Sequence, residues 1–106
     1  MHDIKWSESE KKAARAVYDA ALKRELASIL ARFKEMAANA ATPQDMWQVE
    51  DHLGQQRREI DSKYDYRYSQ LIHVFGRLLR ENWIEEEELQ RLSPEKITCI
   101  QRIATL

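Results

Sequence analysis

The stretch that decides the fold runs from Asp45 to Arg67 and reads DMWQVEDHLGQQRREIDSKYDYR. Steps of three and four residues through it select one stripe, which continues to residue 71: Met46, Glu50, Leu53, Arg57, Ile60, Tyr64, Arg67 and Leu71. This spacing is typical of the seam of a packed helix. Three members of the stripe, Glu50, Arg57 and Arg67, are nevertheless charged, so an apolar core alone does not explain it.

The composition limits the classes of protein to which the chain can belong. Its 106 residues suffice for one domain. A third of the residues are charged, but the net charge is only −1, which gives no bulk attraction to nucleic acid or to anionic lipid. No apolar run is long enough to cross a bilayer, and the start, MHDIKWSESE, has no apolar signal core. The lone Cys99 fits a reducing compartment, so we expect a cytoplasmic protein.

A first long helix is predicted from the capping-box sequence SESE at residues 7–10 to about residue 40. Apolar residues recur in steps of three and four along it. They are Tyr18, Leu22, Leu26, Ile29, Phe33, Met36 and Ala40. Asn39 is a candidate terminator, and Thr42 followed by Pro43 is a start signal for the next helix.

The second helix is predicted to run unbroken from Pro43 past Leu71 to about Glu81. A short helix is expected over residues 84–92. Ser93 and Pro94 then predict the start of a last short helix that carries three isoleucines at positions 97, 100 and 103.

The length of the first helix predicts an elongated molecule and self-association. About 33 residues give a helix of roughly 50 Å, whereas a compact domain of this size is only about 33 Å across. A lone two-helix hairpin would leave much of each apolar stripe in water. We therefore expect an all-α homodimer in which two long antiparallel helices of each copy form a four-helix stalk. Within the single domain 1–106, residues of about 7–65 would form this stalk and about 66–106 a small head of short C-terminal helices.

The charged stripe has two interpretations that the pattern leaves open. In the structural one, Glu50 and Arg57 pair across the dimer or lie at its rim, where such charges set the register of two helices. In the functional one, Trp47, Asp51 and Arg57 or Arg58 form an exposed binding patch near the middle of the stalk. Trp47 and Asp51 share a helix face, and Trp and Arg are enriched in binding hot spots.

The stretch from Trp47 to Ile97 resembles the fluorescence recovery protein family. The shared motif is a Trp, an Asp four residues later, an Arg six residues after that, and then an I-D-x-K-Y-D-x-R run. Here these positions are Trp47, Asp51, Arg57 and residues 60–67. The likeness extends to the LI-VF--LL helix, the Trp-Ile turn with its acidic run, and the L-S-x-E-K start of the last helix. The first helix agrees more loosely, in length and start.

The resemblance implies a non-enzymatic regulator without a cofactor. Proteins of this family bind the photoactivated orange carotenoid protein of cyanobacteria, speed its return to the resting form and so end quenching at the phycobilisome. The family fold is all-helical and dimeric, with a stalk and a head. The family's Trp, Asp and Arg, here Trp47, Asp51 and Arg57, are tied to that activity and lie near the dimer interface.

Three positions depart from the family pattern. Glu50 stands where the family usually has His, His73 lies at an aromatic position of the head, and Cys99 replaces a basic residue. Each departure falls on a surface that the resemblance connects with partner contact. The expected partner-binding or dimer-interface residues are therefore Trp47, Glu50, Asp51, Arg57, Met46, His73 and Cys99.

Two other functions remain as alternatives. Family-like chains also occur in bacteria without the carotenoid protein, so the chain can be a helical interaction dimer with an unknown protein client. The run RREIDSKYDYRYSQLIHVFGRLLR also loosely resembles the first helix of all-helical chorismate mutases, small dimers that use Arg and Lys to stabilise a charged transition state. The spacing after Asp61 does not match that motif. The histidines lack the spacing of metal ligands, so we expect no metal.

Overall fold

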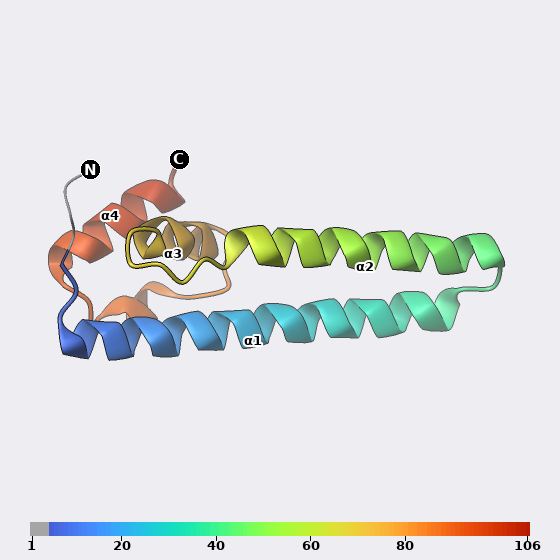
Figure 1. The fold of residues 1–106 in the computed structure, drawn as a ribbon, viewed down its shortest axis with the longest axis horizontal. Coiled ribbons are helices and arrows are strands. Elements are labelled where there is room, and N and C mark those ends of the chain that lie inside the picture. Colours follow the sequence, from blue (N-terminus) through green and yellow to red (C-terminus); the bar gives the residue numbers. More distant parts are fainter. Residues whose placement is uncertain (1–4) are drawn as a thin grey trace.

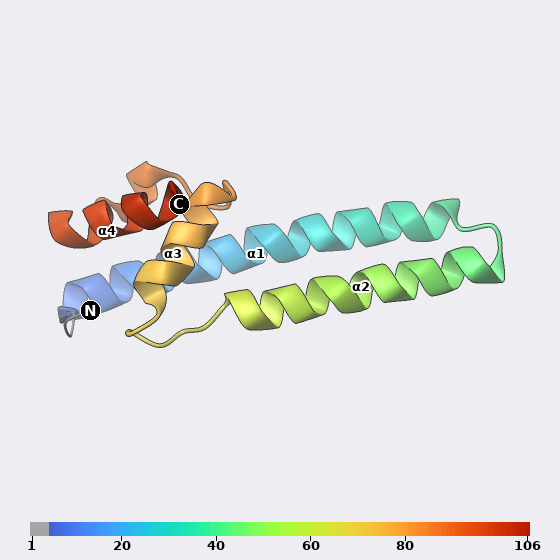
Figure 2. The same ribbon diagram turned by 90° about the horizontal axis from the view of Figure 1, so that it is seen from above.

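The computed structural model describes residues 5–106, and every regular element in that range is helical. The elements, in chain order, are α1 (Glu8–Asn39), α2 (Pro43–Lys63), α3 (Leu71–Arg80), the 3-10 turn η1 (Glu86–Leu89) and α4 (Pro94–Ala104). α1 and α2 form a long antiparallel hairpin, and α3, η1 and α4 gather at its open end (Figures 1 and 2). The predicted all-α class, with two long helices and short C-terminal ones, is confirmed.

The two long helices begin where the sequence predicts. The Ser7 hydroxyl accepts a hydrogen bond from the Glu10 backbone N–H at 3.1 Å, and the Glu10 carboxylate accepts one from the Ser7 N–H at 3.1 Å. Thr42 and Asp45 make the same reciprocal capping box at the start of α2, with Pro43 in its first turn. Each box satisfies backbone donors that a helix start would otherwise leave unpaired.

The chain is elongated, as the helix lengths require. α1 has 32 residues, and the molecule measures 52 × 24 × 23 Å along its principal axes. The turn between α1 and α2 lies at one end of the long axis, and the short helices lie at the other (Figure 1). Both ends of the described chain, Lys5 and Leu106, also lie at the end that holds the short helices.

The prediction of one unbroken helix from Pro43 to about Glu81 is wrong. α2 ends at Lys63, and residues 64–70 form an irregular link before α3 begins at Leu71. Figure 2 shows that α3 runs across the hairpin instead of continuing along α2. A continuous helix would carry Leu71 and Phe75 away from α1, whereas in the structure both side chains are fully buried.

Three tyrosines hold the irregular link against α1. The Tyr64 hydroxyl donates a hydrogen bond of 2.9 Å to Glu25, and the Tyr66 ring meets Tyr18 edge-to-face at 4.7 Å between centroids. Tyr68 packs on Trp6, just before α1, with a centroid distance of 5.8 Å, and the Lys11 Nζ of α1 lies 5.4 Å from the centroid of its ring. These tertiary contacts override the helical periodicity of the segment, since local propensity is the weaker effect.

The helix predicted over residues 84–92 is reduced to the single turn η1. Ile84 and Leu89 are both buried, but in an α-helix their side chains would point about 140° apart. Before this turn, Asn82 adopts φ 66° and closes α3. The N–H of Asn82 bonds to the Leu79 carbonyl at 3.2 Å and that of Trp83 to the Leu78 carbonyl at 2.9 Å, which together form a Schellman motif.

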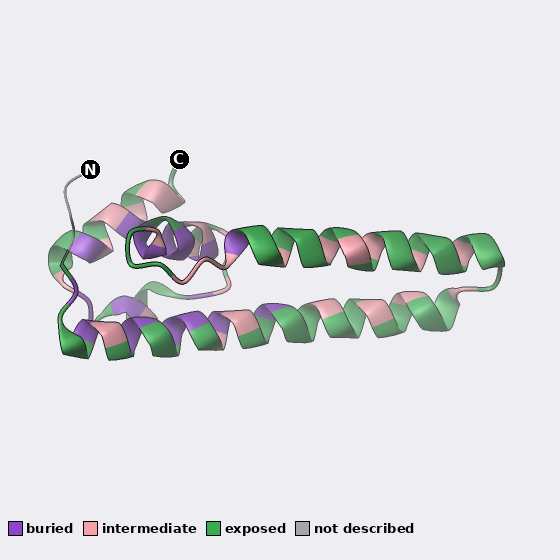
Figure 3. Ribbon diagram, viewed as in Figure 1, coloured by how far each residue is buried: buried purple, intermediate pink, exposed green. Residues whose placement is uncertain are grey.

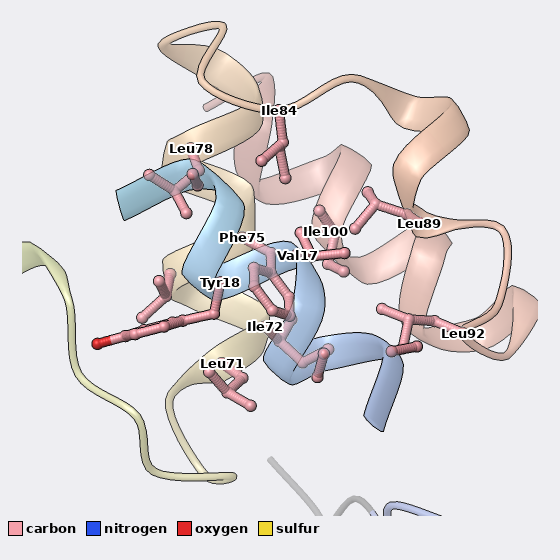
Figure 4. Packing of buried hydrophobic residues seen from close by; sticks show 14 of the residues in the cluster. Val17, Tyr18, Leu71, Ile72, Phe75, Leu78, Ile84, Leu89, Leu92 and Ile100 are labelled. Atoms are coloured by element: carbon pink, nitrogen blue, oxygen red, sulfur yellow. The ribbon is translucent and has the colours of Figure 1, made fainter. Parts of the chain in front are cut away.

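The hydrophobic core lies in the head and includes the first half of α1. Figure 4 shows Val17 of α1 beside Phe75 of α3 and Ile100 of α4, whereas the Tyr18 ring points the other way, toward the link, where it packs on Tyr64 and Tyr66. Small α1 residues let the other helices approach closely. The buried hydrophobic set is Trp6, Ala13, Ala14, Val17, Tyr18, Ala21, Leu71, Ile72, Val74, Phe75, Leu78, Ile84, Leu89, Leu92 and Ile100.

Gly76 lets α4 lie directly on α3. A Cβ atom added at Gly76 would lie 2.6 Å from the Cβ of Ile103 and 3.3 Å from the carbonyl oxygen of Ile100. The first distance is far inside van der Waals contact, so any other residue would push the two helices apart. The glycine is therefore required by the closeness of the helices and not by its own backbone conformation.

A buried ionic cluster joins the end of α2 to α1 and α3. The Lys63 Nζ lies 2.6 Å from Glu25 Oε2 and 2.6 Å from Glu81 Oε1, and only 3% of its side chain is exposed. Arg77 Nε donates to the second oxygen of Glu81 at 2.8 Å. Burial raises the pKa of Glu81, but hydrogen bonds from Lys63 and Arg77 outweigh it and lower the pKa below its usual value. Burial and the bond to Glu25 raise the pKa of the Tyr64 phenol.

A second buried pair fastens α4 to the start of α1. Lys96 Nζ donates to Glu10 Oε1 at 3.1 Å and to the Lys5 carbonyl at 2.7 Å, and the Ser93 N–H donates to Glu10 Oε2 at 2.9 Å. Burial raises the pKa of Glu10, but hydrogen bonds from the Ser7 and Ser93 backbone and from Lys96 lower it from 4.5 to about 2. The carboxylate thus stays ionised in the folded chain at acid pH.

Acid is therefore expected to weaken the fold through Glu10. A carboxyl whose pKa is lower in the folded state contributes stability above its unfolded pKa, and this contribution is lost as pH falls from about 4.5 toward 2. The shift corresponds to about 3 kcal/mol at full value, which we reduce to about 2 kcal/mol because water reaches part of the carboxylate. Urea unfolding of the wild type and of Glu10→Gln between pH 7 and pH 2.5 measures this. The variant should lose less stability than the wild type over that range. If the unfolding free energies of the two proteins instead fall in parallel with pH, the loss does not come from Glu10.

Candidate functional site

The far half of the hairpin has an apolar face that the single chain leaves open. Figure 3 shows that buried residues follow α1 from the head to about its middle, where Glu25 is the last, and that α2 is exposed or half-buried except at its head end, where Lys63 is buried. Five large apolar side chains project there, with exposed fractions between 37% and 56%: Leu26, Leu30, Met46, Trp47 and Leu53. Exposed apolar surface gathered in this way indicates an interaction site.

Two adjoining grooves run along this face between α1 and α2. The groove next to the turn has a volume of about 660 Å³, and its lining is mostly apolar. It is lined by Phe33, Ala37, Ala40, Ala41, Thr42, Pro43, Met46, Val49, Glu50 and Leu53. The groove nearer the head has a volume of about 530 Å³ and is lined by Leu26, Ile29, Glu50, Leu53, Gly54, Arg57, Ile60 and Asp61. Glu50 and Leu53 line both, so the grooves form one continuous surface.

The charged residues of the α2 stripe lie on this open surface. Glu50 makes no ion pair with any residue of 5–106, although it borders both grooves. Arg57 has 84% of its side chain exposed and only a 3.9 Å contact from its Nε to Asp61 Oδ2 one turn later. Such an exposed pair stabilises the chain very little. Both side chains are thus free to bind an outside partner.

The remaining predicted site residues fall into two groups. Trp47 is 56% exposed and Asp51 is exposed, and both lie further round α2, beside the grooves but not in their lining. Met46 lies in the groove next to the turn. His73 is exposed on α3, and Cys99 is half-buried on α4 against the head core. The structure therefore brings Met46, Trp47, Glu50, Asp51 and Arg57 together and places His73 and Cys99 in the head.

The sequence reasoning missed the α1 side of the face. Leu26 was assigned to a general apolar stripe, and Leu30 was not singled out, yet Leu30 is 51% exposed in the structure. The signal was present, because Leu30 follows Leu26 by one helical turn. The buried cluster around Lys63 gave no such signal, because its partners Glu25 and Glu81 are distant in sequence.

Residues 5–106 contain no group of three or more His, Cys, Asp or Glu side chains placed to hold a metal ion. In the same range, no helix combines the length and apolar character needed to span a bilayer. The chemistry that this face offers is that of protein binding: apolar area, an exposed tryptophan beside it, the carboxylate of Glu50 without an ion pair among residues 5–106, and the weakly paired Arg57.

Comparison with known proteins agrees with the resemblance stated above. Residues 6–104 match the family model described as photoprotection regulator fluorescence recovery protein. The chain is 39% identical over 101 residues to the fluorescence recovery protein of Synechocystis sp., with 95% of this chain and 93% of that protein covered. The solved structures of the fluorescence recovery proteins from Fremyella diplosiphon and Synechocystis sp. PCC 6803 each give a TM-score of 0.93. They are 32% and 38% identical, and the match covers 96% of this chain and all of theirs.

Proposed function

This chain belongs to the fluorescence recovery protein family of photoprotection regulators, and from that premise we propose that it binds a photoactivated orange carotenoid protein and accelerates its return to the resting form. Quenching of phycobilisome fluorescence would end as a result. The observation that carries the proposal is the exposed surface of α2, where Arg57 lines a groove of the open face and Trp47 and Asp51 lie exposed on the neighbouring flank. The protein would act in the cytoplasm without a cofactor.

The regulator would act as a homodimer. The open face leaves Leu26, Leu30, Met46 and Leu53 substantially exposed in one chain, and a second copy is the simplest way to cover them. Two hairpins would then make a four-helix stalk from residues of about 7–65, with the heads of 66–106 at its ends. The two heads would present His73 and Cys99 as further client contacts.

The physical action of such a regulator is a population shift. A partner that binds one conformer of its client more tightly moves the equilibrium by that difference in affinity and by no more. To accelerate relaxation it must also favour the transition state between the conformers. A rigid surface with an aromatic anchor and charges of both signs supports this role without a nucleophile or an acid–base pair.

Recovery kinetics test the function directly. Purified carotenoid protein is converted to its red form by light, and the decay of red absorption is then followed in darkness with increasing amounts of this protein. We expect the decay to accelerate and to saturate. An unchanged decay at saturating protein would rule out this function, and if the dimer persists it would favour a family-like interaction dimer with another client.

Trp47→Ala is expected to raise the protein concentration needed for half-maximal acceleration by about tenfold or more, because an exposed Trp in an interface is a typical hot spot. Trp47→Phe should retain part of the effect. Glu59→Ala, an exposed change on the same helix away from the grooves, is the control and should match the wild type. Circular dichroism and light scattering separate lost recognition from lost folding or dimerisation. If Trp47→Ala and Glu59→Ala accelerate recovery equally well at the same concentration, Trp47 is not part of the client-binding site.

A further inference from the structure

The second long helix, α2, buries very little surface of its own. Lys63 is the single buried residue among its 21, and every other residue of α2 is exposed or half-buried. In α3, by contrast, six of ten residues are buried. Helices in proteins are stabilised mainly by packing and less by intrinsic propensity, and α2 contains a glycine and no alanine. The helical structure of α2 in one chain therefore depends on few contacts.

The polar contacts of α2 with the rest of the chain are concentrated at its last turn. Lys63 Nζ lies 2.6 Å from Glu25 Oε2 of α1 and 2.6 Å from Glu81 Oε1 at the end of α3. Within residues 5–106, these are the only hydrogen bonds or ion pairs that join α2 to α1 or to the head. The capping box at the other end of α2 bonds only within the helix and its turn. Lys63, Glu25 and Glu81 thus form a latch at the head end of α2.

The head is fastened to α1 by contacts in which α2 has no part. Arg24 of α1 pairs with Glu88 of η1 at 2.8 Å, and Lys96 of α4 pairs with Glu10 of α1 at 3.1 Å. The Tyr66 ring of the link packs edge-to-face on a tyrosine ring of α1. Each of these contacts would persist if α2 left α1, and so would the hydrophobic core of the head.

We propose that α2 unfolds as a separate cooperative unit while the head and the adjoining half of α1 stay folded, and that the latch sets how often this happens. Openings of single units are typical of elements that have few buried apolar contacts. The turn at residues 40–42 and the link at 64–70 hold both ends of α2. The helix therefore cannot swing away as a rigid body, and it has to lose its helical structure in order to leave α1.

Separate unfolding of α2 would dissolve one part of the candidate site and leave the other part intact. Trp47, Asp51 and Arg57 all lie on α2 and lose their arrangement together when it unfolds, whereas His73 and Cys99 keep theirs in the head. A client that binds α2 must find the helix folded, so its apparent affinity falls with the fraction of chains that are open. This consequence rests on the proposed function, but the unfolding of α2 does not.

Native-state hydrogen exchange of the full chain, followed by NMR at urea concentrations below the unfolding midpoint, tests the proposal. In the wild type, the opening constant of α2 amides should exceed that of the most protected α3 and α4 amides by about tenfold or more. Glu81→Gln removes one charge of the latch but keeps an acceptor, and it should raise the α2 opening constant by about tenfold. The fully unfolded chain has also lost the latch, so exchange in the head should rise by the same factor.

Glu88→Gln is the matched control, because the side chain of Glu88 is 27% exposed and that of Glu81 is 31% exposed. An open α2 leaves the pair of Glu88 with Arg24 intact, so this variant should accelerate exchange in the head and not in α2. Gly76→Ala, whose clash with α4 lies within the head, should act in the same direction and more strongly.

Equal acceleration of α2 and the head by Glu88→Gln or Gly76→Ala would show that α2 unfolds only together with the head, and equal opening constants in the wild type would show the same. Either result would overturn the proposal. Unchanged α2 exchange in Glu81→Gln would show that the Lys63 pairs are not the latch. Exchange is measured without a client and at the lowest workable protein concentration, because self-association would protect α2 separately. Failure of the proposed function would therefore leave this result unaffected.

Discussion

Lys63→Met should lower the free energy of unfolding by about 3–5 kcal/mol. The substitution keeps the volume of the side chain but removes the one cation that lies within 2.6 Å of both Glu25 and Glu81. The Glu25 side chain is only 8% exposed, so its carboxylate would remain in the interior with the Tyr64 hydroxyl as its sole hydrogen-bond donor among residues 5–106. An uncompensated buried charge accounts for most of the loss. Urea unfolding followed by circular dichroism measures the change, at one protein concentration because the proposed self-association would be linked to folding.

Two further variants separate the buried cluster from ordinary ion pairs. Arg32→Met breaks the 3.0 Å pair with Glu35, whose side chains are more than half exposed, and should cost less than about 1 kcal/mol. Glu25→Met combined with Lys63→Met removes both charges and should cost less than Lys63→Met alone. If Lys63→Met were as stable as the wild type, water would be screening the charges that remain in the cluster. That result would contradict the burial of Lys63.

Gly76→Ala should lower the free energy of unfolding by about 2–3 kcal/mol, although alanine is the better helix former by about 1 kcal/mol. The new methyl group would lie 2.6 Å from the Cβ of Ile103 and 3.3 Å from the Ile100 carbonyl, so α4 must move away from α3. The cost is that of overpacking, and it should appear as a lower urea midpoint. Native-state hydrogen exchange should then rise in α4 more than in α2.

The other glycine and the other side of the contact serve as controls. Gly54→Ala places its methyl group 3.5 Å from Arg58 Nη1, an ordinary contact, so the helix propensity of alanine should stabilise the chain by up to about 1 kcal/mol. In an Ile103→Ala background, Gly76→Ala should cost less, because part of the obstructing side chain is gone. If the free-energy costs of Gly76→Ala and Ile103→Ala simply add in the double variant, the destabilisation by Gly76→Ala does not come from the contact between these two residues.

Local signals in the sequence were sufficient for the starts of the long helices and for the overall shape. Ser7 with Glu10 and Thr42 with Pro43 mark the helix starts where the structure has them, and the first helix, predicted to have about 33 residues, has 32. The break at residues 64–70 was missed because its causes are tertiary. Tyr64 and Tyr66 bind residues of α1 that lie far away in sequence, and no glycine or proline marks the site.

The candidate site was likewise predictable only where local spacing along one helix decides it. The spacing of Met46, Glu50 and Arg57 places them on one helix face whatever the tertiary structure, and the grooves of the hairpin lie along that face. Burial, by contrast, depends on which helix packs where. The first half of α1 is covered by the head and the second half is not, although both halves carry the same apolar periodicity.

Because Lys5 and Leu106 both lie at the head end, some 50 Å of hairpin separates them from the turn at residues 40–42. A fluorescent reporter joined to either terminus would therefore lie clear of the grooves. In an antiparallel pair of hairpins the reporters would stand at opposite tips of the assembly, too far apart for efficient energy transfer, whereas side-by-side parallel hairpins would bring them together. Donor and acceptor labels on the chain ends thus provide a simple optical measure of how two copies are oriented.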